Sequence, residues 1–145
     1  MRILDAPRDL VFQALTEPER LRRWRGPHGC TVPVCTIALR RGASCPAGCD
    51  RPEGRDSWCT GVYRDVVAPE RIVCPACYAE EEGNLVAPAH DGLSAAWPAE
   101  TLVTVTFAGH AGTTRLTLQQ SVLVRRPSTY APSVVEVAHV MTQAA

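Results

Sequence analysis

DAPRDLVFQALTEPERLRRWRGPHG, residues 5–29, is the stretch that decides the fold, because it encodes two short helices and a stop. Pro7 suits the first position of a helix, where its missing N–H breaks no hydrogen bond, and Asp5 or Ala6 would be the cap. The apolar residues that follow recur at helical spacing and predict one buried face, made of Leu10, Val11, Ala14 and Leu15.

A second helix begins at once in the same stretch. Thr16 is its predicted cap, Pro18 lies just inside it, and the pair 26–27, Gly-Pro, ends it. Between these limits the helix carries Leu21 and Trp24 towards the same core as the first helix. The two helices identify an architecture but no chemistry.

The sequence beyond residue 29 is mostly extended. Alternating and β-branched residues predict six strands, at 31–40, 43–49, 57–67, 71–79, 101–108 and 113–124. Pro33 places the start of the first strand towards a sheet edge, because proline donates no hydrogen bond to a neighbouring strand. Residues 80–100 show no sustained period and predict a long loop, whereas residues 109–112 predict the turn of the final hairpin.

A last helix is predicted from a cap at Ser133, with Val134 and Val135 at the start of its apolar face. It is rich in β-branched residues, so packing must hold it. The chain therefore predicts an α+β fold of two short helices, five or six antiparallel strands and one terminal helix, the only long element available to cover a face of the sheet. We expect residues 1–145 to form a single domain.

Composition excludes several classes of function. The formal net charge is zero, so no overall field attracts nucleic acid or an anionic membrane. All fifteen basic residues are arginine, which rules out a lysine Schiff base, a lysine general base and a phosphate-binding lysine. Since neither an export signal nor an apolar run long enough to span a membrane is present, we expect a cytoplasmic protein.

An ordered series of motifs resembles a known family. Besides residues 5–29, the series consists of Arg40 with Gly42, PEG at 52–54, GVYRDVVAPERIV at 61–73, EEEGN at 80–84 and TVTFAGHAGTTRLTL at 104–118. The chain is similar to activators of heat-shock protein 90 ATPase of the C-terminal-domain type, within the helix-grip superfamily of START, polyketide-cyclase and birch-pollen-allergen-like domains. This resemblance implies a cavity between a curved antiparallel sheet of about six strands and a C-terminal helix.

The chain departs from its apparent relatives in places that bear on that cavity. Its first strand is limited to residues 1–4, and Arg25 stands after Trp24 where the family has a second tryptophan. Three valines replace the tryptophan and leucines that are common in the terminal helix, which would loosen the grip on a ligand.

The resemblance suggests a site but not a reaction. The candidate cavity residues are Trp24, His28, Trp58, Tyr63, Cys74, Phe107 and Val134. Because the sequence contains no catalytic constellation, we expect a non-enzymatic domain, without cofactor or metal, that binds a small apolar or amphipathic molecule as a monomer or homodimer. One alternative is a stress-response co-chaperone that contacts a heat-shock protein 90 type chaperone. Another is a cyclase or dehydratase in which His28, Tyr63 or Asp65 acts as acid or base.

Seven cysteines invite a metal hypothesis, with the pairs Cys45/Cys49 and Cys74/Cys77 as ligands. Cys74 and Cys77 lie three apart in a predicted strand, so their side chains project to opposite faces unless Pro75 breaks the strand. The resemblance places Cys45 and Cys74 where relatives carry aromatic residues. We expect structural or incidental thiols, with a metal site and a disulfide or redox role as the alternatives.

Overall fold

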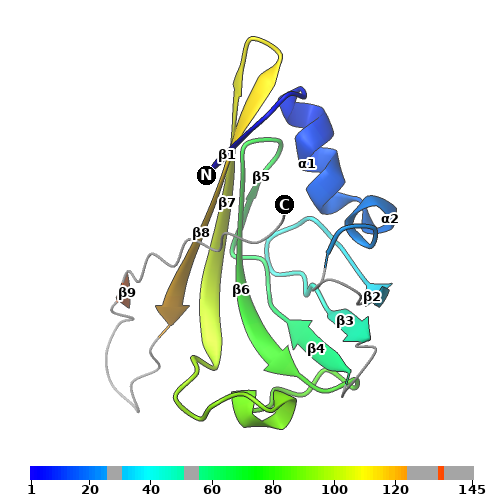
Figure 1. Ribbon diagram of the computed structural model, residues 1–145, viewed down its shortest axis with the longest axis vertical. Coiled ribbons are helices and arrows are strands. Elements are labelled where there is room, and N and C mark those ends of the chain that lie inside the picture. Colours follow the sequence, from blue (N-terminus) through cyan, green and yellow to red (C-terminus); the bar gives the residue numbers. More distant parts are fainter. Residues whose placement is uncertain (26–30, 51–55, 124–133, 136–145) are drawn as a thin grey trace.

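The computed structural model describes residues 1–25, 31–50 and 56–123 and the backbone of 134–135. Two N-terminal helices, α1 (Arg8–Thr16) and α2 (Pro18–Leu21), accompany a curved antiparallel sheet (Figure 1). The strands are β1 (Arg2–Leu4), β2 (Thr31–Cys35), β3 (Ala47–Asp50), β4 (Ser57–Thr60), β5 (Asp65–Val67), β6 (Arg71–Ala79), β7 (Glu100–His110), β8 (Thr113–Leu123) and β9 (Val134–Val135). The predicted α+β class is confirmed.

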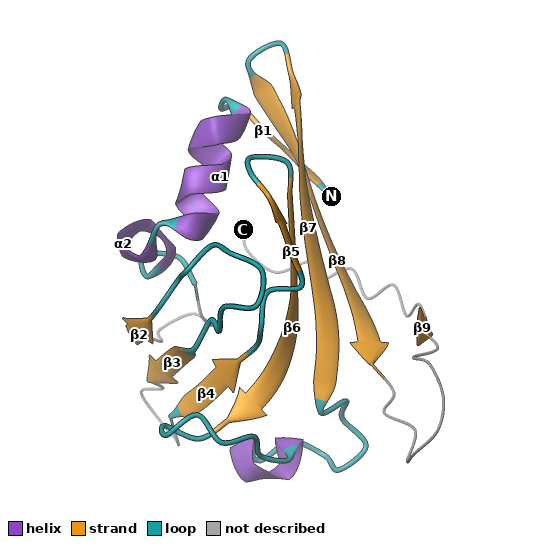
Figure 2. Cartoon of the chain, turned by 180° about the vertical axis from the view of Figure 1, so that it is seen from behind, coloured by secondary structure: helices purple, strands orange, loops and turns teal. Residues whose placement is uncertain are grey.

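The sheet is ordered β1-β8-β7-β6-β4-β3-β2, and the two remaining strands pair beside this path, β5 with β6 and β9 with β8. Every described strand pair is antiparallel. The long strands β6, β7 and β8 form its centre (Figure 2). The described residues thus form more strands than the predicted five or six, because the short strands β1 and β9 both pair with β8 and the strand predicted at 57–67 divides into β4 and β5.

The helices begin close to the predicted prolines. Pro7 is the N-cap of α1 rather than its first residue, and Glu17 caps α2 in place of Thr16, with Pro18 at the first turn. Thr16 instead ends α1, where its hydroxyl donates a 2.8 Å hydrogen bond to the carbonyl of Phe12. Leu10, predicted to be buried, is 45% exposed.

The core lies between α1 and the central strands. Phe12 is 7% exposed and meets Phe107 of β7 edge to face, with ring centroids 5.2 Å apart. Other buried residues of this cluster are Val11, Ala43, Tyr63, Ile72 and Val105. Thr114 of β8 is fully buried and donates a 2.7 Å hydrogen bond to the carbonyl of Ala6, which fixes the entry to α1 on the sheet. Packing of aromatic rings and this single hydrogen bond therefore set the position of the helices.

Several predicted strands are shorter in the structure. The strand expected at 31–40 ends at Cys35, and β2 lies at the sheet edge as Pro33 predicted. The strand expected at 57–67 divides into β4 and β5, which both pair with β6 but are separated by residues 61–64, where the register with β6 shifts by one residue. Strand β6 at 71–79 and the long β7–β8 hairpin match the prediction closely, and the expected loop contains a short 3-10 helix, η1 (Pro88–Asp91).

The predicted terminal helix is wrong at its first turn. Val134 and Val135 form β9, which pairs with Leu123 and Val122 of β8. Two adjacent β-branched residues favour an extended backbone, and this preference outweighs the helical one here. The remainder of the predicted helix lies outside the described residues.

Candidate functional site

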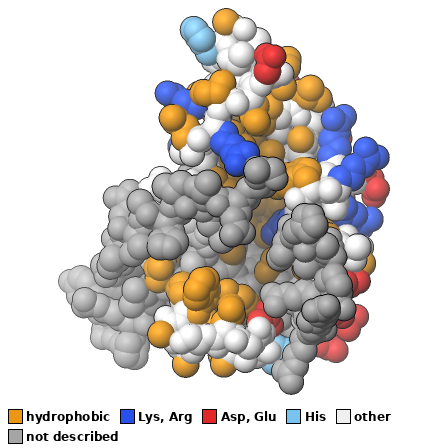
Figure 3. All heavy atoms as spheres, viewed as in Figure 1, with side chains coloured by type: hydrophobic (Ala, Val, Ile, Leu, Met, Phe, Trp, Pro, Cys, Tyr) orange, Lys and Arg blue, Asp and Glu red, His pale blue; other side chains and the backbone are white. Residues whose placement is uncertain are grey.

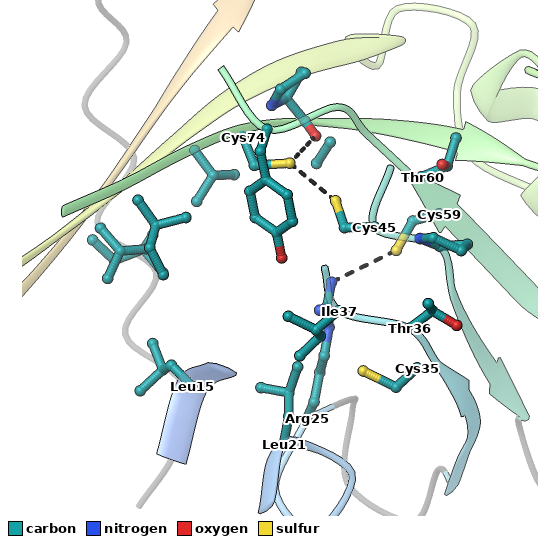
Figure 4. Close-up of a pocket in the computed structure, with 18 of the residues that line it drawn as sticks. Leu15, Leu21, Arg25, Cys35, Thr36, Ile37, Cys45, Cys59, Thr60 and Cys74 are labelled. Atoms are coloured by element: carbon teal, nitrogen blue, oxygen red, sulfur yellow. Dashed lines mark hydrogen bonds between the residues drawn. The ribbon is translucent and has the colours of Figure 1, made fainter. Parts of the chain in front are cut away.

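A cavity of about 280 Å³ lies between the end of α2 and the concave side of the sheet (Figure 4). Most of its lining is apolar, and hydrophobic side chains gather in the recessed centre of the face shown in Figure 3. The described residues that line it are Leu15, Leu21, Trp24, Arg25, Cys35, Thr36, Ile37, Cys45, Pro46, Cys59, Thr60, Tyr63, Ile72, Cys74, Pro75, Ala76, Val103, Val105 and Leu118.

Three of the predicted cavity residues contribute to this lining. Tyr63 lies on the segment between β4 and β5, and Cys74 lies on β6. Trp24 follows α2 and is 54% exposed, with its indole N–H donating a 3.1 Å hydrogen bond to the carbonyl of Ala14. It thus lies at the rim rather than in the core towards which the sequence directed it.

The other predicted residues lie elsewhere or beyond the described part. Phe107 belongs to the core with Phe12, and Trp58 of β4 packs over Gly48, where an added Cβ would meet the indole ring at 2.7 Å. Neither is among the described residues that line the cavity. His28 lies outside the described residues, as does the side chain of Val134.

Arg25 is the one charged side chain among the described lining residues. Its backbone N–H donates a 2.9 Å hydrogen bond to the carbonyl of buried Leu21, so the end of α2 holds the residue at the cavity. Its guanidinium donates to the sulfur of Cys59 at 3.7 Å. The neighbouring arginines Arg20 and Arg22 point away into ion pairs with Glu17 and Glu19, as expected for a solvated helix face.

Two cysteine sulfurs meet in the cavity wall. The sulfurs of Cys45 and Cys74 are 3.0 Å apart, although 29 residues separate them in sequence. The hydrogen bond from Cys74 lowers the pKa of the Cys45 thiol, and the Arg25 charge contributes to the same effect. The same hydrogen bond, together with burial, raises the pKa of Cys74. Of the two thiols, Cys45 is therefore the one that ionises first as the pH rises, and Cys74 keeps its proton longer.

The remaining titratable groups of the wall stay neutral near pH 7. Burial raises the pKa of Cys35 and of Cys59, against the opposing charge of Arg25. Burial also raises the pKa of Tyr63, whose phenol therefore remains a hydrogen-bond donor at neutral pH. The cavity thus combines apolar walls, neutral donors and one fixed positive charge.

Within the described residues, the groups named by the enzymatic alternative and by the metal hypothesis are brought together only in part. Of the predicted acid and base residues, Tyr63 lines the cavity, whereas Asp65 accepts a 2.9 Å hydrogen bond from Arg71 and is not among the described lining residues. Within the described part of the chain, no group of three or more His, Cys, Asp or Glu side chains is placed to hold a metal ion. Cys74, but not Cys77, is among the lining residues, as the strand geometry predicts.

Sequence reasoning missed two features of the site. Arg25 was noted as a departure from the family pattern and not as a cavity residue, and Cys45 was weighed as a metal ligand or an incidental thiol but not paired with Cys74. A signal was present for Cys45, since both it and Cys74 occupy positions where the family resemblance implies aromatic residues. Cys45 and Cys74 both line the same cavity, where their side chains are neighbours.

Comparison with known proteins gives a consistent result. Residues 5–143 match the family described as Activator of Hsp90 ATPase homolog 1-like protein. Comparison with curated proteins gives no match. No helix in the described residues is long and apolar enough to cross a membrane.

Solved structures share the fold at low sequence identity. Protein Ms6760 from Mycobacterium smegmatis is 21% identical, with a TM-score of 0.66 over 81% of this chain and 66% of that one. A protein from Rhodobacter sphaeroides is 26% identical, with a TM-score of 0.63 and the same coverage of 81% and 66%. The AHSA1 protein of Silicibacter pomeroyi is 17% identical, with a TM-score of 0.64 over 82% and 74% of the two chains. This chain spans about two thirds of the length of the first two structures.

Proposed function

The chain belongs to the family described as Activator of Hsp90 ATPase homolog 1-like protein, and we propose that it binds a small, mostly apolar molecule with one acidic group in the cavity described above. The observation that carries this proposal is the charge of Arg25 among described lining residues that are otherwise apolar or neutral. A guanidinium pairs with a carboxylate because its fork of donors matches two oxygens, and Arg25, although exposed to solvent, is held at the apolar wall by its contact with Cys59.

The size and polarity of the cavity narrow the class of ligand. A volume of about 280 Å³ is near the lower end of ligand sites, which span about 300–1,000 Å³. Ile72 and Val105 offer an apolar surface, and Tyr63 offers a neutral donor. A compact aromatic or alicyclic acid fits this combination, whereas a dianion would bring one charge without a partner among the described lining residues.

Isothermal titration with 1-naphthoic acid and its neutral amide tests the proposal. The acid is expected to bind more tightly than the amide. Arg25→Met should weaken binding of the acid about 2- to 5-fold, the equivalent of a lost solvent-exposed ion pair, and leave the amide unchanged. Arg115→Met is the matched control, because Arg115 is exposed and lies three residues from Leu118, on the other face of β8. Equal binding of the acid to Arg25→Met and to the unchanged protein would contradict the proposal.

A second candidate is interaction with an Hsp90-type chaperone, which the description of the family favours. The test is the ATPase rate of a purified bacterial Hsp90-type chaperone with and without an excess of this chain. A raised rate supports the interaction. An unchanged rate, together with separate elution of the two proteins in size-exclusion chromatography, counts against it.

A further inference from the structure

The contact between Cys45 and Cys74 has a chemical use beyond lining the cavity. Their sulfurs are 3.0 Å apart, as the dashed line in Figure 4 shows. A disulfide bond is about 2.05 Å long, so the two sulfurs need to approach by only about 1 Å to form one. Side-chain rotation in a partly open cavity wall supplies movement of this size.

The backbone holds the two thiols in this position. The Cys45 N–H donates a 2.9 Å hydrogen bond to the carbonyl of Gly61, and the Cys45 thiol donates to the same oxygen at 3.3 Å. Gly61 in turn lies so close to β6 that an added Cβ would be 1.8 Å from the carbonyl oxygen of Pro75 and 3.1 Å from the sulfur of Cys74. The segment before β3 is therefore held beside residues 61–63, which lie next to β6, and both sulfurs line the cavity.

The two thiols also differ in reactivity in the way that thiol–disulfide exchange needs. The lowered pKa of Cys45 favours the thiolate, the form that attacks a disulfide. Cys74 retains its proton and lies next to it as the second thiol. Both residues line the cavity, which gives a small reagent a path to Cys45.

We propose that Cys45 and Cys74 form a reversible disulfide with a low-molecular-weight disulfide as oxidant, so that the cavity wall is a site of redox modification. The Cys45 thiolate attacks one sulfur of the oxidant, RSSR, and releases one RS⁻, which leaves a mixed disulfide on Cys45. The Cys74 thiol, on losing its proton, then attacks the Cys45 sulfur and releases the second RS⁻. In sum, two protein thiols and RSSR give the protein disulfide and two RSH. This chemistry does not depend on the proposed ligand.

The test uses the full chain, reduced and then exposed to oxidised glutathione, with free thiols blocked by iodoacetamide. Intact mass should show the loss of two hydrogens, carbamidomethyl groups on the five other cysteines and no added glutathione. Trypsin should then release residues 42–55 linked to residues 72–115, and fragment-ion sequencing of the linked peptides should place the bond between Cys45 and Cys74 on the unchanged protein. Dithiothreitol should restore both thiols.

Single substitutions separate this pair from the other cavity thiols. Cys74→Ser should stop at a mixed disulfide that carries one glutathione, whereas Cys35→Ser and Cys59→Ser should still form the link. A bond between other cysteines, or stable glutathione adducts on the unchanged protein, would overturn the proposal. Because the bond is assigned on the unchanged protein, a variant that fails to fold does not affect this outcome.

Discussion

Gly61→Ala should destabilise the fold and distort the cavity wall where Gly61 contacts Pro75. Gly61 has room for no side chain, because an added Cβ would lie 1.8 Å from the carbonyl oxygen of Pro75 and 2.9 Å from its carbonyl carbon. Real Cβ atoms essentially never approach a neighbour within 3.0 Å, so the two backbones must separate by about 1.2 Å at the oxygen. Both atoms belong to the backbone, so no side-chain rotation relieves the contact.

The expected loss of stability follows from that displacement. The separation strains the 2.9 Å hydrogen bond from Cys45 to Gly61 and the 3.0 Å hydrogen bond from Tyr63 to Ala43. A hydrogen bond contributes about 0.5–1.5 kcal/mol, and overpacking costs about 1–3 kcal/mol. We therefore expect Gly61→Ala to lower the free energy of unfolding by about 2–4 kcal/mol. It should also slow formation of the link between Cys45 and Cys74.

Urea denaturation followed by tryptophan fluorescence measures the change. The matched control is Gly109→Ala in β7, where an added Cβ meets the Arg8 side chain at an ordinary 3.5 Å. The control should remain within about 0.5 kcal/mol of the unchanged protein. If Gly61→Ala also remained within that range, the close approach of Gly61 to the Pro75 backbone of β6 would be refuted.

Two further predictions address the core and the titration of the cavity wall. Phe12→Ala should lower the free energy of unfolding by about 3–5 kcal/mol, and Leu10→Ala by less than about 0.5 kcal/mol, because Phe12 is 7% exposed and Leu10 45%. If urea denaturation showed a larger loss of stability for Leu10→Ala than for Phe12→Ala, the buried face of α1 would be the one that carries Leu10. Burial raises the pKa of Tyr63 in the folded chain, so above about pH 10 the unfolded chain loses this proton first and stability falls as pH rises. Tyr63→Phe should show a shallower decline of the urea midpoint over this alkaline range, and an unchanged decline would contradict the assignment.

The sequence predicted the architecture well because prolines and alternating residues act locally. Pro18 stands at the start of α2, and the strand at 71–79 has the predicted limits. The buried face of α1 was harder, since a helix of nine residues is too short for apolar spacing alone to distinguish Phe12 from Leu10. The ring of Phe107, distant in sequence, decides between them.

The site was predictable only where a residue acts within its own segment. The family resemblance led to Tyr63 and Cys74, which line the cavity. The contact of Cys45 with Cys74 depends on the close approach of Gly61 to Pro75. No local sequence pattern reveals a contact between residues that are 29 positions apart. Arg25 reaches the cavity because of the direction in which α2 ends, which also depends on tertiary packing.

The central claim, that this cavity binds a small apolar acid, is tested most directly by NMR chemical shifts during a titration with 1-naphthoic acid. The methyl groups of Ile72, Val103 and Val105 line the cavity, whereas that of Ile3 is exposed on β1 at the sheet edge and serves as the reference. We predict saturable shifts of the three cavity residues and of the Arg25 side-chain N–H, with Ile3 unchanged. Shifts absent from the cavity residues, or equal at Ile3, would contradict the claim.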